Sequence, residues 1–228
     1  MMKVFGILVL LLSLGAIASE KSVYDFAWLD KDKEVYVLQN RKYRKDGRLY
    51  VGVSGLTTLS GAFVDSFGGS ARLGYFFKED WGFEFQYSKY TGDENDTAKG
   101  VRQQGVVPFY RKFDSVMTGL VWWSPFYAKI NTFNEIFYFD WMLGLGVSQI
   151  SALDNRNKFS TPPSSTLTRE SIMGATWSTA MRFHINQAWS FRLDFTGTHF
   201  NAERKSAAKS ESQLFSNYDF GAGIIFAF

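Results

Sequence analysis

The chain ends in an alternating pattern of residues that runs to Phe228. Counting back in steps of two from Phe228 gives an apolar face, and the residues in between give a small, partly polar face. The apolar face is formed by Tyr218, Phe220, Ala222, Ile224, Phe226 and Phe228. The other face is formed by Asn217, Asp219, Gly221, Gly223, Ile225 and Ala227. Because successive side chains of a strand point to opposite sides, this pattern predicts a strand with lipid on one side and a protein interior on the other.

Residues 1–18 have the pattern of an export signal. Lys3 gives a short basic start, residues 4–14 form an apolar run, and Ala16-Ile17-Ala18 is a small-x-small cleavage site. The run is too short to span about 30 Å of hydrocarbon, so it predicts a cleaved signal peptide rather than an anchor. The chain has no Cys, which excludes a lipid-modified cysteine near that site and fits an exported protein without disulfides.

The apolar residues of the remaining chain are interleaved with polar ones. Aromatic residues make up 18% of the chain, yet no later apolar run approaches the roughly 20 residues of a transmembrane helix. The net charge of +3 gives no indication of nucleic-acid binding. Two β architectures share this alternation, a membrane barrel and a secreted soluble sandwich, and the connections between strands distinguish them.

Eight alternating segments are predicted as strands. They cover residues 48–57, 67–77, 81–91, 113–124, 136–149, 172–185, 189–200 and 216–228. The charged residues 19–47 before them are interpreted as a periplasmic extension, and the basic cluster of Arg41, Lys42, Arg44 and Lys45 within it is expected to be solvated. A further strand hidden in residues 101–110 is the alternative, and it would give a ten-stranded barrel.

The connections alternate in length. Those at residues 78–80 and 186–188 are tight and the one at 125–135 is moderate, whereas those at 91–112, 151–171 and 201–215 are long and polar. Short turns on one side and long loops on the other are typical of the periplasmic and extracellular ends of bacterial barrels. The sequence therefore predicts an all-β, antiparallel, up-and-down transmembrane β-barrel at residues 48–228. We expect it to be a monomer in the outer membrane of a Gram-negative bacterium.

Charged residues of both signs fall on the predicted inner face. They are Arg72, Glu84, Asp140, Arg182, Arg192, Asp194 and Asp219. An outward Arg would cost about 2–4 kcal/mol at the bilayer midplane, so these side chains are expected to point inward and to pair there. Since eight strands leave just enough room for side chains, a plugged interior is predicted, with a narrow ion path as the alternative. Trp81, Trp189 and Phe228 are expected in an aromatic girdle at the periplasmic strand ends.

Several short motifs carry a resemblance. They are Val37-Leu38-Gln39-Asn40-Arg41, Arg72-Leu73-Gly74-Tyr75, the run from Trp123 to Lys129, and Phe139-Asp140. With them the chain resembles a largely uncharacterised family of outer-membrane β-barrel domain proteins, and its architecture resembles the eight-stranded barrels of OmpA and OmpX type. The resemblance implies location and fold and brings no catalytic or ligand-binding residue. No OmpA-type peptidoglycan-binding domain is expected after the last strand.

The C-terminal strand also predicts a partner. Its alternate aromatic residues, with a glycine between them, are interpreted as the signal that the barrel-assembly machinery binds. That signal consists of Tyr218, Phe220, Gly223, Phe226 and Phe228. The other expected partners are outer-membrane lipids and lipopolysaccharide, while the long loops each sum to about +1 and name no ligand. The predicted role is structural, or recognition through the extracellular loops.

An enzymatic role is the third alternative, as a lipid A-modifying barrel. It needs a nucleophile within hydrogen-bond reach of a base. His184 and His199 are the two histidines, and the residues two positions further on are Asn186 and Asn201. Neither position offers a serine on the same strand face, so no catalytic residue is predicted.

A metal site and a cofactor are not predicted either. Asp93, Glu94 and Asp96 give the segment at residues 92–96 a superficial likeness to a calcium loop. That segment lacks the central Gly and the final Glu of an EF-hand, so it is interpreted as a solvated acidic tip.

Overall fold

The computed structural model describes residues 41–132, 135–159, 166–205 and 210–228. The predicted signal peptide at residues 1–18 and the segment 19–40 therefore lie outside the described residues. The strands are β1 (Arg48–Thr58), β2 (Val64–Phe76), β3 (Trp81–Glu94), β4 (Arg111–Thr132), β5 (Glu135–Asp154), β6 (Thr168–His184), β7 (Trp189–Lys205) and β8 (Ser210–Ala227). The helices are α2 (Asp96–Gln103) and the 3₁₀ helix η2 (Arg156–Phe159). No helix in these ranges is long and apolar enough to cross a membrane.

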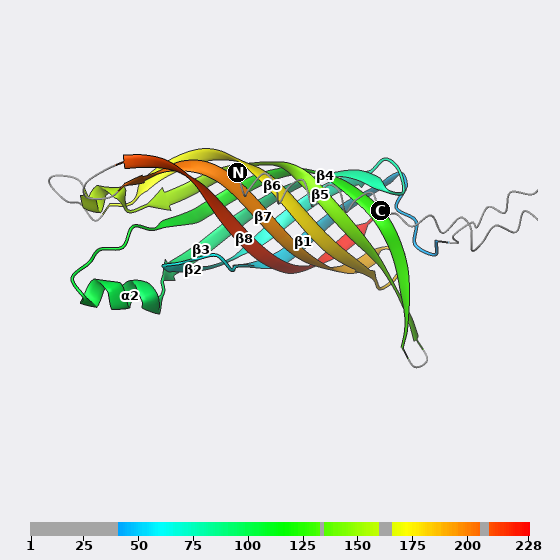
Figure 1. Ribbon diagram of the computed structural model, residues 1–228. Helices are drawn as coiled ribbons and strands as arrows, with labels where there is room; N and C mark the ends of the chain where they lie inside the picture. The colour runs from blue at the N-terminus through cyan, green and yellow to red at the C-terminus, as the bar shows by residue number, and fades with distance from the viewer. Residues whose placement is uncertain (1–40, 133–134, 160–165, 206–209) are drawn as a thin grey trace, which may run out of the picture. The chain divides into compact units, whose positions relative to one another are not determined.

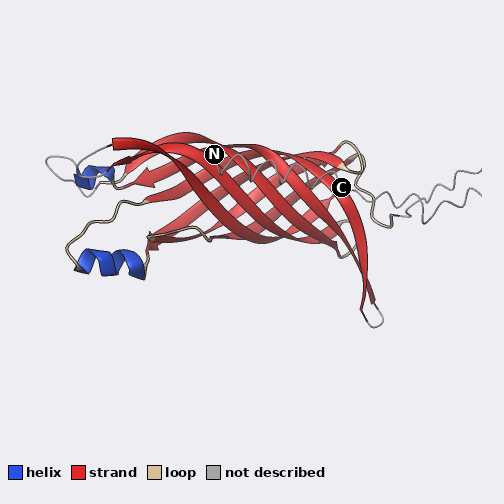
Figure 2. Cartoon of the chain, in the orientation of Figure 1, coloured by secondary structure: helices blue, strands red, loops and turns tan. Residues whose placement is uncertain are grey.

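Each strand pairs antiparallel with the next, and β8 pairs with β1, so the sheet closes into a barrel (Figure 1 and Figure 2). At the seam, the Phe228 N–H donates to the Leu49 carbonyl at 2.9 Å, and the Phe228 carbonyl accepts from Arg48 Nε at 2.9 Å. The predicted eight-stranded, antiparallel, up-and-down barrel is thereby confirmed. The ten-stranded alternative is wrong, because residues 101–110 contain the end of α2 and no strand.

Side chains alternate between the two sides of the wall. In β3, Phe83 and Phe85 point outward and are more than half exposed, whereas Gly82 and Glu84 are buried. We call the outward apolar residues the apolar belt, and every strand contributes to it. Examples taken one from each strand are Val53, Leu73, Phe83, Val121, Leu145, Met181, Phe191 and Ile224.

The two ends of the barrel differ. The termini end carries Arg48, Phe228 and the tight turns at residues 77–80 and 185–188, and the loop end carries α2 and η2. An apolar cluster fills the lumen toward the termini end, with Tyr50, Phe76, Leu120, Trp122, Met142, Ala180, Ile225 and Ala227. A second cluster lies toward the loop end and includes Leu56, Tyr90, Phe113, Val116, Ile150 and Phe200.

The strands at the loop end are longer than the sequence predicts. Residues expected in long loops continue the ladders, since β3 extends to Glu94, β5 to Asp154 and β7 to Lys205. In these extensions the inner face stays buried, as at Ile150, Ala152 and Ala202, while the outer face is more polar than the apolar belt. The outward apolar residues that mark a membrane strand in the sequence are therefore sparse in this part of the chain.

The helix α2 was also not expected from the sequence. Its N-cap is Asn95, whose side-chain oxygen accepts the Ala98 N–H at 3.0 Å. Asp96 in the first turn and Arg102 in the last turn complement the helix dipole. Only Ala98 of this helix is buried, so it has no apolar stripe by which a helix is recognised.

The hairpin of β4 and β5 continues beyond the barrel wall at the termini end. Its register runs on to the pair Thr132↔Glu135, so the connection predicted at residues 125–135 is wrong. We call residues 126–132 and 135–137 the β4–β5 arm. In Figure 1 the arm passes beyond the lower outline of the barrel, near the C-terminus.

A bulge marks the point where the arm leaves the wall. The Ser124 N–H donates to the Asp80 carbonyl at 2.7 Å, and the β3–β4 register ends at Trp81↔Trp123. Pro125 follows, within the register shift that β4 makes against β5. A proline lacks the N–H of a ladder bond, and it is tolerated here because the register shift interrupts the β4–β5 ladder at this residue.

Packing at Gly74 gives a test of the interior. A Cβ at Gly74 would lie 2.1 Å from Tyr50 Cζ, and Tyr50 is buried with its hydroxyl bonded to Glu84 at 2.6 Å. We expect Gly74→Ala to lower the free energy of unfolding by about 1–3 kcal/mol, because the ring has no room to move. The urea midpoint of the refolded barrel in detergent measures this.

The matched control is Gly119→Ala, since a Cβ at Gly119 meets nothing within 4 Å. Its urea midpoint should stay near that of the unsubstituted chain. Equal midpoints for the two variants would contradict the packing of Tyr50 against Gly74.

Candidate functional site

Four charged side chains from β2, β3 and β7 meet across the lumen, and we call them the central network. Arg192 Nη1 donates to Glu84 Oε2 at 2.6 Å, and Arg192 Nε donates to Asp194 Oδ1 at 2.7 Å. Arg72 Nη1 donates to Asp194 Oδ2 at 2.9 Å. All four are buried, with at most 5% of each residue exposed. Two guanidinium groups therefore face two carboxylates in a space without open solvent.

Neutral groups complete the central network. The Tyr50 hydroxyl donates to Glu84 Oε2 at 2.6 Å, and Ser54 Oγ accepts from Arg72 Nη2 at 2.6 Å. The Arg192 guanidinium lies 4.6 Å from the centre of a Trp122 ring. Buried charges are tolerated when they are paired and most of their remaining donors and acceptors are bonded, and these contacts do so for all but Arg72 Nε.

A second cluster closes the termini end. Lys45 Nζ lies 2.5 Å from Asp140 Oδ1 and 2.7 Å from Ser124 Oγ, with 2% of Lys45 exposed. His184 Nε2 lies 2.7 Å from the other Asp140 oxygen. The Tyr43 ring stacks on His184 with 4.9 Å between centroids. The segment before β1 thus inserts a cation into the barrel.

The sequence analysis missed Lys45 because it treated the basic cluster as solvated. Of that cluster, Arg41 pairs with Glu79 and Asp80 on the turn before β3, and Lys45 lies inside. One signal was available, since the predicted interior had four carboxylates and three guanidinium groups. A buried carboxylate without a cation predicts that one more positive side chain reaches the lumen.

The other predicted interior charges lie apart from the central network. The Arg182 guanidinium lies 5.4 Å from the centre of the Tyr50 ring. Asp219 accepts hydrogen bonds from neutral groups, at 2.6 Å from Thr58 Oγ1, 3.1 Å from the Tyr90 hydroxyl and 2.9 Å from Asn217 Nδ2. All seven predicted residues are buried, and four of them form one network.

The residues of the predicted assembly signal lie on β8. Tyr218, Phe220, Phe226 and Phe228 are on its outer face, where Phe226 packs against Trp189 and Phe228 at 4.9 and 5.0 Å between centroids. Gly223 points inward, and a Cβ there would lie 2.2 Å from the Val53 carbonyl oxygen. The glycine is therefore required for the close approach of β8 to β1.

Each histidine has a serine opposite it on the next strand. Ser190 Oγ lies 3.3 Å from His184 Nδ1, and Ser216 Oγ lies 2.8 Å from His199 Nδ1. The sequence analysis searched along one strand and missed both, because the pairs His184↔Ser190 and His199↔Ser216 depend on register. The first pair was within reach, since the turn between its strands is short.

The hydrogen bonds of His199 argue against activation of Ser216. Trp177 Nε1 lies 3.0 Å from His199 Nε2, and an indole N–H can only donate. His199 Nε2 is thus an acceptor, and the neutral ring carries its proton on Nδ1. That N–H donates to Ser216, whereas a general base would accept the serine proton.

The acidic residues near α2 are ion-paired. Glu94 bonds to Arg102, and Asp96 Oδ1 lies 3.0 Å from Lys99 Nζ. No group of three or more His, Cys, Asp or Glu in the described part of the chain is placed to hold a metal ion.

A cavity of about 230 Å³ opens at the loop end, and we call it the outer cup. It lies between the β1–β2 connection, the start of β4 and the β7–β8 hairpin. Its wall is largely aromatic, with Phe63, Phe109, Tyr110, Phe113, Phe200 and Phe215. Phe113 and Phe200 also belong to the apolar cluster beneath, so that cluster forms the floor of the cup.

Arg111 is the buried cation of the outer cup. Its side chain is 4% exposed and lies 5.0 Å from the centre of the Phe215 ring. Nη2 donates to Glu170 at 3.1 Å and to the Glu203 carbonyl at 2.9 Å. Nε and Nη1 are buried and have no hydrogen-bond acceptor among the described residues. A buried guanidinium with two such donors has capacity for a further acceptor.

Tyr110 lies in the same wall, and its hydroxyl is hydrogen-bonded to Glu94. Burial raises the pKa of its hydroxyl, and the carboxylate of Glu94 raises it further. The hydroxyl therefore stays protonated at neutral pH.

The comparisons with known proteins concern the fold. No family model matches the chain, and no curated protein matches it. Among solved structures, the N-terminal β-barrel domain of OprF from Pseudomonas aeruginosa is similar at 13% identity and a TM-score of 0.50, over 80% of this chain and 98% of that one. OprG from the same organism is similar at 13% identity and 0.48, over 82% and 98%. Neisserial surface protein A is similar at 11% and 0.45, over 80% and 100%.

The closed sheet defines the structural class of the chain. The chain is a closed, eight-stranded, antiparallel up-and-down barrel with an apolar outer wall. Its architecture is that of the small OmpA and OmpX type barrels, as the resemblance in the sequence predicted.

The central network gives a second test. Glu84→Gln keeps an acceptor for Tyr50 and removes one of two carboxylates that face Arg192 and Arg72. We expect the free energy of unfolding to fall by about 3–5 kcal/mol, because a guanidinium stays buried without its counter-charge. Adding Arg192→Met should restore part of the loss. Urea titration in detergent measures both.

The control is Asp96→Asn, which breaks the exposed ion pair with Lys99 and should leave the midpoint nearly unchanged. If Glu84→Gln were as stable as this control, the central network would not stabilise the barrel.

Proposed function

We propose that the protein is an integral barrel of the outer membrane of a Gram-negative bacterium, with a closed interior and a recognition role at its loop end. The apolar belt supports the location. It contains residues from all eight strands, while the charged residues that alternate with it, such as Arg72, Glu84 and Arg192, are buried. Exposure of such a belt to water would be unfavourable, whereas contact with lipid acyl chains would not.

The orientation follows from the two ends. The termini end has tight turns and exposed Trp81, Trp123 and Trp189, which fit one membrane interface. In barrels of this type the tight turns face the periplasm, so the loop end would face outside. The signal peptide at residues 1–18 and the role of the C-terminal strand as an assembly signal stay predictions.

The closed interior is inferred from contacts that cross the lumen. Arg192 on β7 bonds to Glu84 on β3, and these strands are not neighbours in the sheet. Lys45 fills the lumen toward the termini end. An eight-stranded barrel has little room beyond its own side chains, so these contacts leave no wide path.

Conductance tests the closed interior against a transport role. In planar bilayers the full chain should give no steady, large conductance, because the charges of the lumen neutralise each other and fill it. A steady and weakly selective current in most insertions would contradict the proposal and favour the channel alternative. Heat-dependent migration on a gel, measured on the same sample, shows that the barrel is folded.

Recognition at the loop end rests on one observation, the two buried donors of Arg111 beside the outer cup. An aromatic wall with a buried guanidinium suits an amphipathic anion, whose acceptor would bond to Arg111 and whose apolar part would lie on Phe113 and Phe215. Lipopolysaccharide, expected as a partner from the sequence, carries such groups.

A small probe tests the outer cup. 4-Fluorobenzoate combines an aromatic ring with a carboxylate, and its ¹⁹F signal should broaden with the refolded barrel. Arg111→Met should abolish the broadening, because the carboxylate loses its donor. Arg156 still contacts Asp154 and Glu170 in this variant, so the carboxylates keep a cation.

The matched control is Arg169→Met, at a well-exposed arginine that pairs with Asp114 outside the outer cup. It should bind the probe as the unsubstituted chain does. Broadening that persists in Arg111→Met would remove the support for this site.

We infer no enzymatic role. For His199 and Ser216 the support is the tautomer that Trp177 imposes, and for His184 and Ser190 it is their burial, with 9% and 1% exposed. Release of acyl chains from lipid A by the purified barrel, lost in His199→Ala, would overturn this inference.

A further inference from the structure

The β4–β5 arm has two different faces. The outer face carries the pairs Ala128↔Phe139 and Ile130↔Phe137, and it continues the belt side of the wall at Trp141. Ile130 and Phe137 are about half exposed in the structure, so nothing in the described chain covers them. An apolar surface that is continuous with a lipid-facing wall predicts the same partner.

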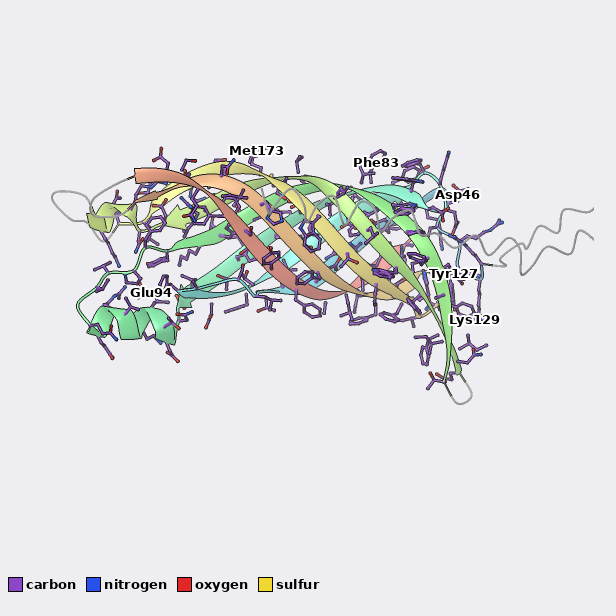
Figure 3. The ribbon with its side chains drawn as sticks, in the orientation of Figure 1. Asp46, Phe83, Glu94, Tyr127, Lys129 and Met173 are labelled. Carbon is purple, nitrogen blue, oxygen red and sulfur yellow. The ribbon has the colours of Figure 1, made fainter. Side chains whose placement is uncertain are left out.

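The inner face of the arm is more polar. Tyr127, Lys129 and Asn131 lie on it, with Ile136 opposite Asn131. At the root of the arm, the Tyr127 hydroxyl accepts the Lys42 N–H at 3.1 Å. Figure 3 shows Tyr127 and Lys129 on the part of the hairpin that leaves the barrel. The segment before β1 therefore covers the inner face at its base and leaves the outer face free.

The direction of the arm brings its outer face toward a membrane. Figure 1 shows the arm leaving the end of the barrel and passing beyond its outline, rather than continuing along the barrel. When a strand pair bends away from a barrel axis, the face that was outside becomes the concave face. That face then looks back toward the leaflet that surrounds the termini end.

The free edge of β4 limits how deep the arm can lie. After Ser124 no strand within the described ranges pairs with β4 on the β3 side, so the backbone groups on that edge need water. Unpaired backbone groups are excluded from hydrocarbon, whereas the headgroup region is hydrated. Amphipathic elements at this boundary bury their apolar side by about 5–10 Å.

We propose that the β4–β5 arm lies along the periplasmic leaflet of the outer membrane, with its outer face among the lipid headgroups and upper acyl chains. The occupant of this face is a glycerophospholipid leaflet. This inference rests on the membrane location proposed above. The arm widens the footprint of the barrel on one side, at the root of β4 and β5.

The absence of Cys allows single labels to be placed in the full chain. Ile130→Cys and Phe137→Cys report on the outer face, and Asn131→Cys reports on the inner face. Val53→Cys in the apolar belt and Lys99→Cys on exposed α2 are the references for lipid and water. Each variant carries a nitroxide on its single cysteine and is reconstituted into vesicles of phosphatidylethanolamine and phosphatidylglycerol.

Collision with oxygen and with a soluble nickel complex gives the depth of each label. We expect the labels at 130 and 137 to lose nickel accessibility and to gain oxygen accessibility relative to the label at 131. They should fall between the two references, closer to the lipid one.

Three other results would overturn the inference, and they are distinguishable. If the label at 53 is in lipid while those at 130 and 137 match the label at 99, the arm is in water and the proposed location stands. If the label at 53 is itself open to nickel, the location fails as well. Protection at 130 and 137 in native outer membranes but not in vesicles would mean a protein partner instead of lipid.

Discussion

The contact between Arg192 and Glu84 is the interaction on which the barrel depends. The two residues lie on β7 and β3, which no ladder joins, so their bond spans the lumen. A buried ion pair contributes little net stability compared with apolar packing, but it is intolerant of a missing partner. Each strand that carries a charge is thereby fixed in register, since a slip by one residue would turn that charge toward lipid.

Buried side chains bond to each other across the lumen, and the two ends of the barrel differ. The loop end has an open cup with a buried arginine, and its strands continue beyond the belt. At the termini end, Lys45 enters the lumen from outside the sheet. Function is thus expected on the surfaces at the ends, in agreement with the general rule that loops on a rigid scaffold carry binding sites.

The sequence predicts the features that depend on the alternation of apolar and polar residues, and few others. The strand number and the direction of Phe83 and Glu84 follow from alternation against lipid. The upper parts of β5 and β7 were missed, because their buried residues face the interior while their outer face is largely polar and lacks the apolar residues of the belt. The serines beside His184 and His199 were missed because they are neighbours by register rather than by spacing. Lys45 was missed because a run of basic residues is normally interpreted as exposed to solvent. Only the excess of carboxylates over guanidinium groups in the predicted barrel interior indicates that one of them is buried.

Asp140 connects the closed end to the arm. It lies opposite Tyr127 in the register at the root of the arm, and its carboxylate holds Lys45 and His184 inside the barrel. The arm therefore cannot swing at its root without separating a buried carboxylate from its cation, which is strongly unfavourable. The direction of the arm is set by the interior of the barrel and not by the surface that the arm would contact. A surface that is already held in its binding orientation loses little conformational entropy on binding. A few apolar side chains on the arm would therefore be enough to influence the orientation of the barrel in a membrane.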